Sequence, residues 1–163
     1  IIIQGGKSRN DTVMNICKYI KENFEITDDD FVITHDSVRP FITQRIIEDN
    51  IKMCKKYGAT DTVIPASDTI VESTGHETIS SIPVRGNMYQ GQTPQSFRVK
   101  EFIDINEQLS EKEKEILTDA AKVYVLKNKQ VGLVMGESYN MKITNLYDLK
   151  LANLMLDILS NKE

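Results

Sequence analysis

The first 66 residues alternate between short apolar runs and amphipathic stretches. Residues 1–4 and 31–34 are short apolar runs, which are typical of buried strands. Residues 13–20 and 46–54 place apolar side chains three or four positions apart, the spacing of a helix that buries one face. A third strand is predicted within residues 60–66. This βαβαβ order predicts an α/β domain with a mostly parallel sheet flanked by helices.

The pattern changes between residues 68 and 97. The segments "DTIVES", "HETISSIPV" and "NMYQGQTPQSF" are short, rich in β-formers and separated by Gly75, Pro83 and Gly91. They predict a β-rich arm at about 68–97. Helical patterns, one more strand and a closing amphipathic helix follow, with no internal repeat or linker. We therefore expect a single domain over residues 1–163 that carries an arm.

The start of the chain has an unusual composition for a domain boundary. It begins without Met, and three consecutive isoleucines precede Gly5 and Gly6, a pattern typical of the interior of a buried strand. We expect the domain to be N-terminally incomplete upstream of Ile1.

Composition excludes several classes of protein. A net charge of −4, with lysine and arginine scattered along the 163 residues, does not give the basic stripe of a nucleic-acid binder. No apolar run approaches the roughly 18 residues of a membrane span. Cys17 and Cys54 lie in helical patterns without a CxxC spacing or a nearby histidine, which indicates reduced core thiols. We expect a cytoplasmic protein with neither nucleic-acid nor membrane partners.

Polar clusters follow three of the predicted strands, at residues 5–12, 35–39 and 140–144. Ligands bind at the carboxyl ends of strands in open α/β sheets, so these clusters are candidate site residues. In "HDSVRPF", Asp36 offers the hard oxygen ligands that Mg²⁺ prefers, and Arg39 offers a planar fork that matches phosphate. An Asp36–Arg39 pair that caps the strand end explains the same spacing equally well.

The other polar segments also have plain structural explanations. The two glycines of "GGKSRNDT" allow the backbone to approach a ligand, or form an ordinary turn. Arg85 can be an incidental hairpin residue, Thr118 a helix N-cap and Lys142 a solvated lysine. His35 is expected to be a hydrogen-bonded structural residue and not a general base.

Taken in order, these segments resemble one family of enzymes. "GGKSRNDTV", "HDSVRPF", "DTIVES", "YQGQTPQSF", "LTDA" and "NMKITNLYDLKLA" occur as in cytidylyltransferases that activate sugar-alcohol phosphates. One branch acts on ribitol 5-phosphate, for cell-wall or capsule polymers such as teichoic acid. The other acts on 2-C-methyl-D-erythritol 4-phosphate, for isoprenoid synthesis. "DTIVES" followed by "MYQGQTPQSF" is more similar to the ribitol phosphate branch, which we therefore favour.

The resemblance implies a Rossmann-like domain whose β-arm forms a homodimer. It implies that CTP and D-ribitol 5-phosphate give CDP-ribitol and pyrophosphate with Mg²⁺. Lys142 would be catalytic by stabilising charge on the α-phosphate, and Asp36 would hold Mg²⁺. Nucleotide-binding residues would be Gly5, Gly6, Thr12 and Asp36. Substrate-binding residues would be Arg39, Thr69, Arg85, Thr93 and Thr118, of which Thr69 and Arg85 lie on the arm and would serve the partner's site.

One family feature has no counterpart in the sequence. Family members begin with a strand and a Gly-rich basic loop that surrounds the CTP triphosphate, and no segment of this chain matches that loop. This leaves a second hypothesis open, in which the protein is a non-catalytic relative that dimerises or binds a nucleotide without turnover.

Overall fold

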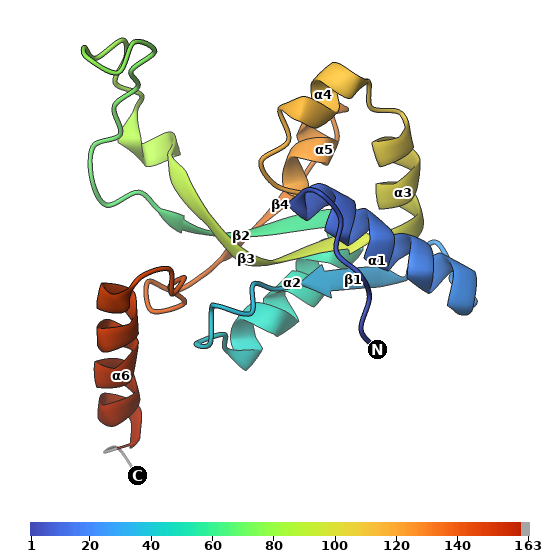
Figure 1. The fold of residues 1–163 in the computed structure, drawn as a ribbon, viewed down its shortest axis with the longest axis horizontal. Helices are drawn as coiled ribbons and strands as arrows, with labels where there is room; N and C mark the ends of the chain where they lie inside the picture. The colour runs from blue at the N-terminus through green and yellow to red at the C-terminus, as the bar shows by residue number, and fades with distance from the viewer. Residues whose placement is uncertain (161–163) are drawn as a thin grey trace.

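The computed structural model describes residues 1–160, which form one mixed sheet flanked by helices (Figure 1). The elements are, in chain order, α1 (Arg9–Asn23), β1 (Phe31–Thr34), α2 (Gln44–Tyr57), β2 (Ala59–Pro65), the 3-10 helix η1 (Arg85–Asn87), β3 (Tyr89–Arg98), α3 (Val99–Glu107), α4 (Glu111–Glu115), α5 (Ala121–Leu126), β4 (Gly132–Met135) and α6 (Leu146–Ser160). The helices and strands predicted between residues 9 and 66 are confirmed.

The sheet is mixed, so the prediction of a mostly parallel sheet is wrong. Its order is β1-β3-β2-β4, in which β2 and β4 are parallel while β3 is antiparallel to both of its neighbours. The chain leaves β2 at Pro65 and returns in β3 at Tyr89, and these two residues are paired in the ladder. Because the chain re-enters the sheet at the end where it left, without a crossover helix, β3 runs antiparallel to β2.

Residues 1–4 do not form the predicted strand. They lead toward α1 without regular structure, and Ile1 and Ile2 are fully exposed. An apolar run becomes a strand only where a neighbouring strand accepts its backbone hydrogen bonds, and none does so here among the described residues.

The capping box at the start of α1 fixes where this helix begins. The Ser8 hydroxyl accepts a hydrogen bond from the backbone N–H of Asp11 at 3.1 Å, and the Asp11 carboxylate accepts one from the Ser8 N–H at 3.0 Å. The two bonds satisfy backbone donors that the first turn of a helix leaves free. Arg9 is therefore the first residue of α1.

Residues 68–84 extend away from the sheet (Figure 1, upper left). A single isolated bridge, Glu72–Ser81, pairs the two sides of this segment. Residues 89–97, the last part of the predicted arm, lie instead in β3 within the sheet. We use "arm" below for residues 68–84 alone.

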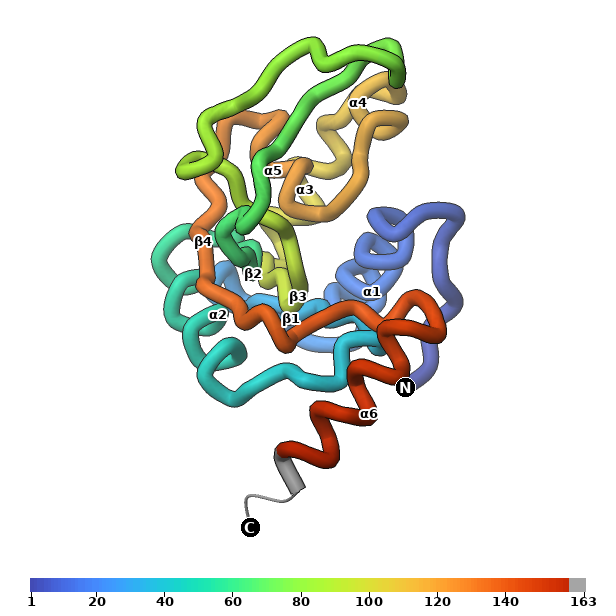
Figure 2. Tube along the Cα trace, turned by 90° about the vertical axis from the view of Figure 1, so that its left-hand side faces the viewer, coloured from blue at the N-terminus to red at the C-terminus, as the bar shows by residue number. Residues whose placement is uncertain are grey.

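Helices cover both faces of the sheet (Figures 1 and 2). Phe97 and Ser96 are neighbours on β3, so their side chains point to opposite faces. Phe97 packs against the tilted ring of Phe102 of α3, with ring centroids 5.1 Å apart, and stacks with Tyr124 of α5 at 5.8 Å. Ser96 instead donates a hydrogen bond to Asn50 of α2. The larger apolar core thus lies between β3 and the helices α1, α3 and α5.

α6 extends away from the rest of the domain (Figure 1, lower left) and exposes many of its apolar side chains, including Leu146 and Tyr147. Within residues 1–160, no helix combines the length and the apolar character that crossing a membrane requires.

Asn50 joins α2 to two strands from a fully buried position. Its Nδ2 donates to the Ile46 carbonyl and the Thr62 hydroxyl, each at 2.9 Å. Its Oδ1 accepts from the hydroxyls of Thr60 at 2.7 Å and Ser96 at 3.2 Å. All hydrogen-bonding groups of this amide are used, so the side chain links α2, β2 and β3 through hydrogen bonds.

We expect Asn50→Ala to lower the free energy of unfolding by about 2 to 4 kcal/mol, because it leaves buried hydroxyls without their partner. Urea unfolding followed by circular dichroism measures this change. Asn15→Ala, on the exposed side of α1, is the matched control and should change stability by less than about 0.5 kcal/mol. Equal effects of the two substitutions would contradict this account of Asn50.

Candidate functional site

A cavity of about 190 Å³ opens where the turn after β1, the loop after β4 and the start of α1 meet β3. Its lining residues are Arg9, Asp36, Arg39, Gly91, Gln92, Thr93, Gln95, Thr118, Asp119 and Lys142. Three cations and two carboxylates therefore line it, which leaves a positive surplus suited to an anionic ligand.

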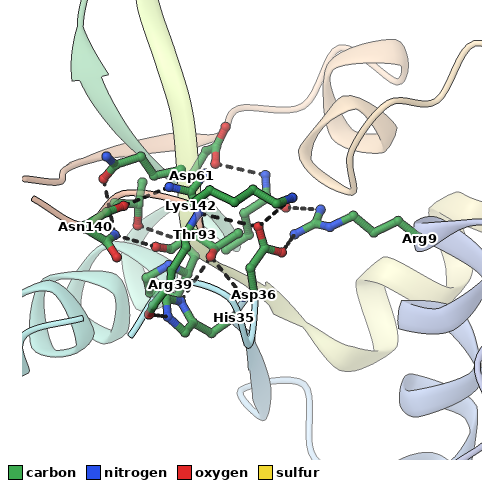
Figure 3. A network of polar contacts seen from close by, with 12 residues as sticks. Arg9, His35, Asp36, Arg39, Asp61, Thr93, Asn140 and Lys142 are labelled. Carbon is green, nitrogen blue, oxygen red and sulfur yellow. Dashed lines mark hydrogen bonds and ion pairs between the residues drawn. The ribbon is translucent and has the colours of Figure 1, made fainter. Parts of the chain in front are cut away.

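Asp36 is the centre of this cavity, because cations from three separate segments contact its carboxylate (Figure 3). Arg9 Nη2 lies 3.6 Å from Oδ1, Arg39 Nε lies 3.4 Å from Oδ2, and Lys142 Nζ lies 3.3 Å from Oδ2. Only 18% of the Asp36 side chain is exposed. The local Asp36–Arg39 pair considered from the sequence does form, but it is one part of a larger cluster.

The charge state of Asp36 follows from these contacts. Partial burial acts to raise the pKa of its carboxyl group, but the hydrogen bond and charge of Lys142, together with the charges of Arg9 and Arg39, lower that pKa below its usual value. Asp36 is therefore ionised at neutral pH, and its negative charge offsets the repulsion among the three cations.

Hydrogen bonds hold the turn that carries Asp36. His35 Nε2 lies 2.8 Å from the Arg39 carbonyl oxygen, which can only accept, so Nε2 carries a hydrogen. In the neutral ring, Nδ1 then accepts from the Thr93 hydroxyl at 3.0 Å. The same hydroxyl accepts from the Asp36 N–H at 3.0 Å. Both ring nitrogens are used within the fold, which confirms the prediction that His35 is structural.

Asn140 connects the loop after β4 to this turn. Its side chain is fully buried and its Nδ2 donates to the Thr93 carbonyl at 2.8 Å, while its own carbonyl accepts from Arg39 Nη1 at 2.8 Å. Three residues later, the Ile143 N–H donates to the Val38 carbonyl at 2.9 Å. Lys142 lies between these two anchors, which explains why its ammonium group is directed at Asp36.

The structure brings together half of the residues proposed from the sequence. Asp36, Arg39, Thr93, Thr118 and Lys142 line the same cavity. The remaining five do not line it.

Of these five, Gly5, Gly6 and Thr12 form a separate group at the start of α1, where the Gly6 N–H donates to the Thr12 hydroxyl at 2.9 Å. Thr69 and Arg85 lie in or next to the arm, and Arg85 donates to the Ser67 carbonyl at 3.2 Å.

Sequence reasoning did not single out Arg9, Gln95 or Asp119, all of which line the cavity. Arg9 lies inside "GGKSRNDT" and Gln95 inside "QTPQ", so both segments were recognised while these side chains were not. Nothing in the spacing of the two segments indicates that Arg9 and Gln95 meet, because 86 residues separate them.

The sequence model of the 2-C-methyl-D-erythritol 4-phosphate cytidylyltransferase (IspD) family matches residues 1–158. Among solved structures, the chain is similar to the 4-diphosphocytidyl-2C-methyl-D-erythritol synthase of Anaerococcus prevotii, with 28% identity and a TM-score of 0.82. That match covers 95% of this chain and 69% of the other.

Two further solved structures of enzymes with this activity in their names share the fold of the chain. The chain is 26% identical to the 2-C-methyl-D-erythritol 4-phosphate cytidylyltransferase of Francisella tularensis, with a TM-score of 0.83 over 94% of this chain and 70% of the other. It is 25% identical to the 2-C-methyl-D-erythritol 4-phosphate cytidylyltransferase of Thermus thermophilus, with a TM-score of 0.78 over 96% of this chain and 73% of the other. Because the family match spans almost the whole sequence and the fold is shared, the chain belongs to the IspD family of cytidylyltransferases.

Proposed function

We propose that the protein transfers the cytidylyl group of CTP to the phosphate of a polyol phosphate, releasing pyrophosphate. The observation that supports this most directly is the convergence of Arg9, Arg39 and Lys142 on one cavity. An acceptor phosphate oxygen would attack the α-phosphorus of CTP while the bond to pyrophosphate breaks. The attacking oxygen is already anionic, so the reaction needs no general base, and the cavity offers no free histidine for that role.

Two of these cations, Lys142 and Arg39, have distinct proposed roles in the transfer. Lys142 would stabilise the charge that grows on the α-phosphate oxygens, since it is held near the cavity by the anchors on either side of it. Arg39 would bind the acceptor phosphate through Nη2, because its Nε contacts Asp36 and its Nη1 donates to the Asn140 carbonyl. Thr93 and Thr118, which line the same cavity, would complete this acceptor site.

The start of α1 is the proposed cytidine site. A Cβ added at Gly6 would lie 2.2 Å from Asp11 Cβ, so the chain packs against α1 only because Gly6 has no side chain. Gly5 and Thr12 lie beside it, and the positive end of the α1 dipole favours the phosphates of a nucleotide there.

We propose Mg²⁺ as the cofactor. Among residues 1–160 no group of three or more histidine, cysteine, aspartate or glutamate side chains is arranged to hold a metal ion. Asp36 would supply one carboxylate to Mg²⁺ that arrives with a nucleotide, because Mg²⁺ commonly takes one or two carboxylates together with substrate phosphates and water. Bound in this way, Mg²⁺ would neutralise charge on the phosphates that leave as pyrophosphate.

The first candidate acceptor is 2-C-methyl-D-erythritol 4-phosphate, because the matching family model and the relatives described above carry its name. None of those relatives is named for ribitol 5-phosphate, so they do not support the preference drawn from the sequence. Ribitol 5-phosphate remains the second candidate, favoured by "DTIVES" followed by "MYQGQTPQSF". Both acceptors present a phosphate to the same cations.

We expect the protein to release pyrophosphate from CTP, in the presence of Mg²⁺, when a polyol phosphate is added. The value of kcat/KM should be about 10-fold or more higher for 2-C-methyl-D-erythritol 4-phosphate than for ribitol 5-phosphate. Coupled pyrophosphate detection with each acceptor, and with neither as the control, measures this. The reverse preference would assign the ribitol reaction, and no turnover with either would refute the proposed transfer.

We expect Lys142→Ala to lower kcat by about 100- to 1000-fold, because it removes a preorganised positive charge from the transition state. Lys150→Ala, at an exposed position of α6, is the matched control and should leave kcat unchanged. Steady-state kinetics at saturating CTP, with thermal unfolding to verify the fold, tests this. Near-normal turnover in Lys142→Ala would rule out the role proposed for this lysine.

We further propose that the arm pairs with a second copy of the chain to form a homodimer. Its side chains Val71, Ile79, Ile82 and Val84 are all more than half exposed, which is a large apolar surface for a projecting segment. In such a dimer, Thr69 and Arg85 would serve the site of the partner.

We expect Ile82→Asp to convert a dimer into a monomer, because it places a charge within the apolar contact. Val125→Asp is the matched control, since Val125 and Ile82 are both 60% exposed and Val125 lies on α5, outside the arm. Light scattering after size-exclusion chromatography measures the mass of each variant. A dimer that persists in Ile82→Asp, or a monomeric wild type, would contradict the proposal.

A further inference from the structure

Arg9 reaches the cavity from the first position of α1 and contacts two other segments (Figure 3). Its Nη1 donates to Gln95 Oε1 on β3 at 2.8 Å, and its Nη2 lies 3.6 Å from Asp36 Oδ1. No other described side chain accepts a hydrogen bond from this guanidinium. A guanidinium has five N–H groups, so most of those of Arg9 are available to a ligand in the cavity.

Asp61 fixes which way the Gln95 amide faces. Gln95 is 2% exposed, and its Nε2 donates to Asp61 Oδ1 at 2.9 Å. Because the amide carries one donor group and one carbonyl oxygen, this bond directs Oε1 toward Arg9. In the reversed amide, two donor groups would face each other and the contact with Arg9 would be lost.

Asp61 is suited to this orienting task at neutral pH. Burial raises the pKa of its carboxyl group to about 6, and the negative charge of Asp119 adds to this effect. The hydrogen bond from Gln95 and the charge of Arg9 act in the opposite direction. Asp61 is therefore ionised above about pH 6 and accepts hydrogen bonds only, which excludes the reversed amide.

We infer that Arg9 is a further substrate-binding residue that contacts a substrate phosphate, and that Gln95 and Asp61 are positioning residues that hold its guanidinium in the cavity. The inference rests on the proposed cytidylyl transfer. Arginine matches phosphate because its planar fork gives two parallel hydrogen bonds, and Arg9 faces the same space as Arg39 and Lys142. The alternative is that Arg9 only ties α1 to the sheet.

Kinetics of Arg9→Ala separate these two roles. Loss of one charged phosphate contact should raise KM for one substrate and lower kcat/KM by about 10- to 100-fold, with the melting temperature close to that of the wild type. The substrate whose KM rises, CTP or the polyol phosphate, identifies which phosphate Arg9 binds. Arg45→Ala is the control, because Arg45 pairs with Asp49 and Glu137 on the exposed side of α2. A value of kcat/KM within about twofold of wild type would overturn the inference.

A double-mutant cycle tests whether Gln95 acts through Arg9. Gln95→Leu should lower kcat/KM in the wild-type background and have no additional effect in the Arg9→Ala background. Full additivity of the two substitutions would overturn the positioning role of Gln95.

The dependence of kcat/KM on pH tests the positioning role of Asp61. The wild-type kcat/KM should fall as pH drops below about 6, because protonation of Asp61 frees the Gln95 amide to turn. Asp61→Asn, which does not titrate, should lose less kcat/KM over this range than the wild type does. The acceptor phosphate also takes up a proton near about pH 6, which lowers kcat/KM equally in both proteins. An equal loss in both proteins would overturn the role of Asp61. A wild type without turnover refutes the proposed function itself, whereas an active wild type with a fully active Arg9→Ala refutes only this inference.

Discussion

The interaction on which the rest of the site depends is the contact of one carboxylate with three cations. Arg9, Arg39 and Lys142 come from the start of α1, the turn after β1 and the loop after β4, and would repel one another without Asp36 between them. The side chain of Asp36 is 18% exposed, so water screens these charges less than it would at the surface. The cluster therefore fixes three segments and at the same time leaves the cavity with a surplus of positive charge.

Most other polar contacts near the cavity keep this cluster in place. Thr93 holds the Asp36 backbone and the His35 ring, and Asn140 joins the loop after β4 to β3 and to Arg39. These bonds lie within the protein itself and orient the charges toward the cavity. Such preorganisation is the usual way in which phosphoryl-transfer enzymes lower their barrier, since little covalent chemistry is required of the protein.

The antiparallel strand β3 makes this arrangement possible. It runs between β1 and β2, and Thr93 and Gln95, two residues apart, point to the same face. One strand thus contacts Asp36 through Thr93, and contacts both Arg9 and Asp61 through Gln95. From the sequence, residues 89–97 were assigned to the arm, and the mostly parallel sheet was predicted from the βαβαβ order of residues 1–66. Neither pattern shows that β3 enters the sheet between β1 and β2 or in which direction it runs.

The sequence by itself determined the features that depend on near neighbours. The helices at α1 and α2 follow from apolar spacing, and Asp36 and Arg39 stand out because one short motif contains both. The ordered set of motifs was enough to indicate a cytidylyltransferase family. The tertiary structure decided what depends on residues far apart: the absence of a strand at residues 1–4, the direction of β3, and the meeting of Arg9 with Gln95 across 86 residues. Local spacing cannot show such contacts, because they exist only once the chain has folded.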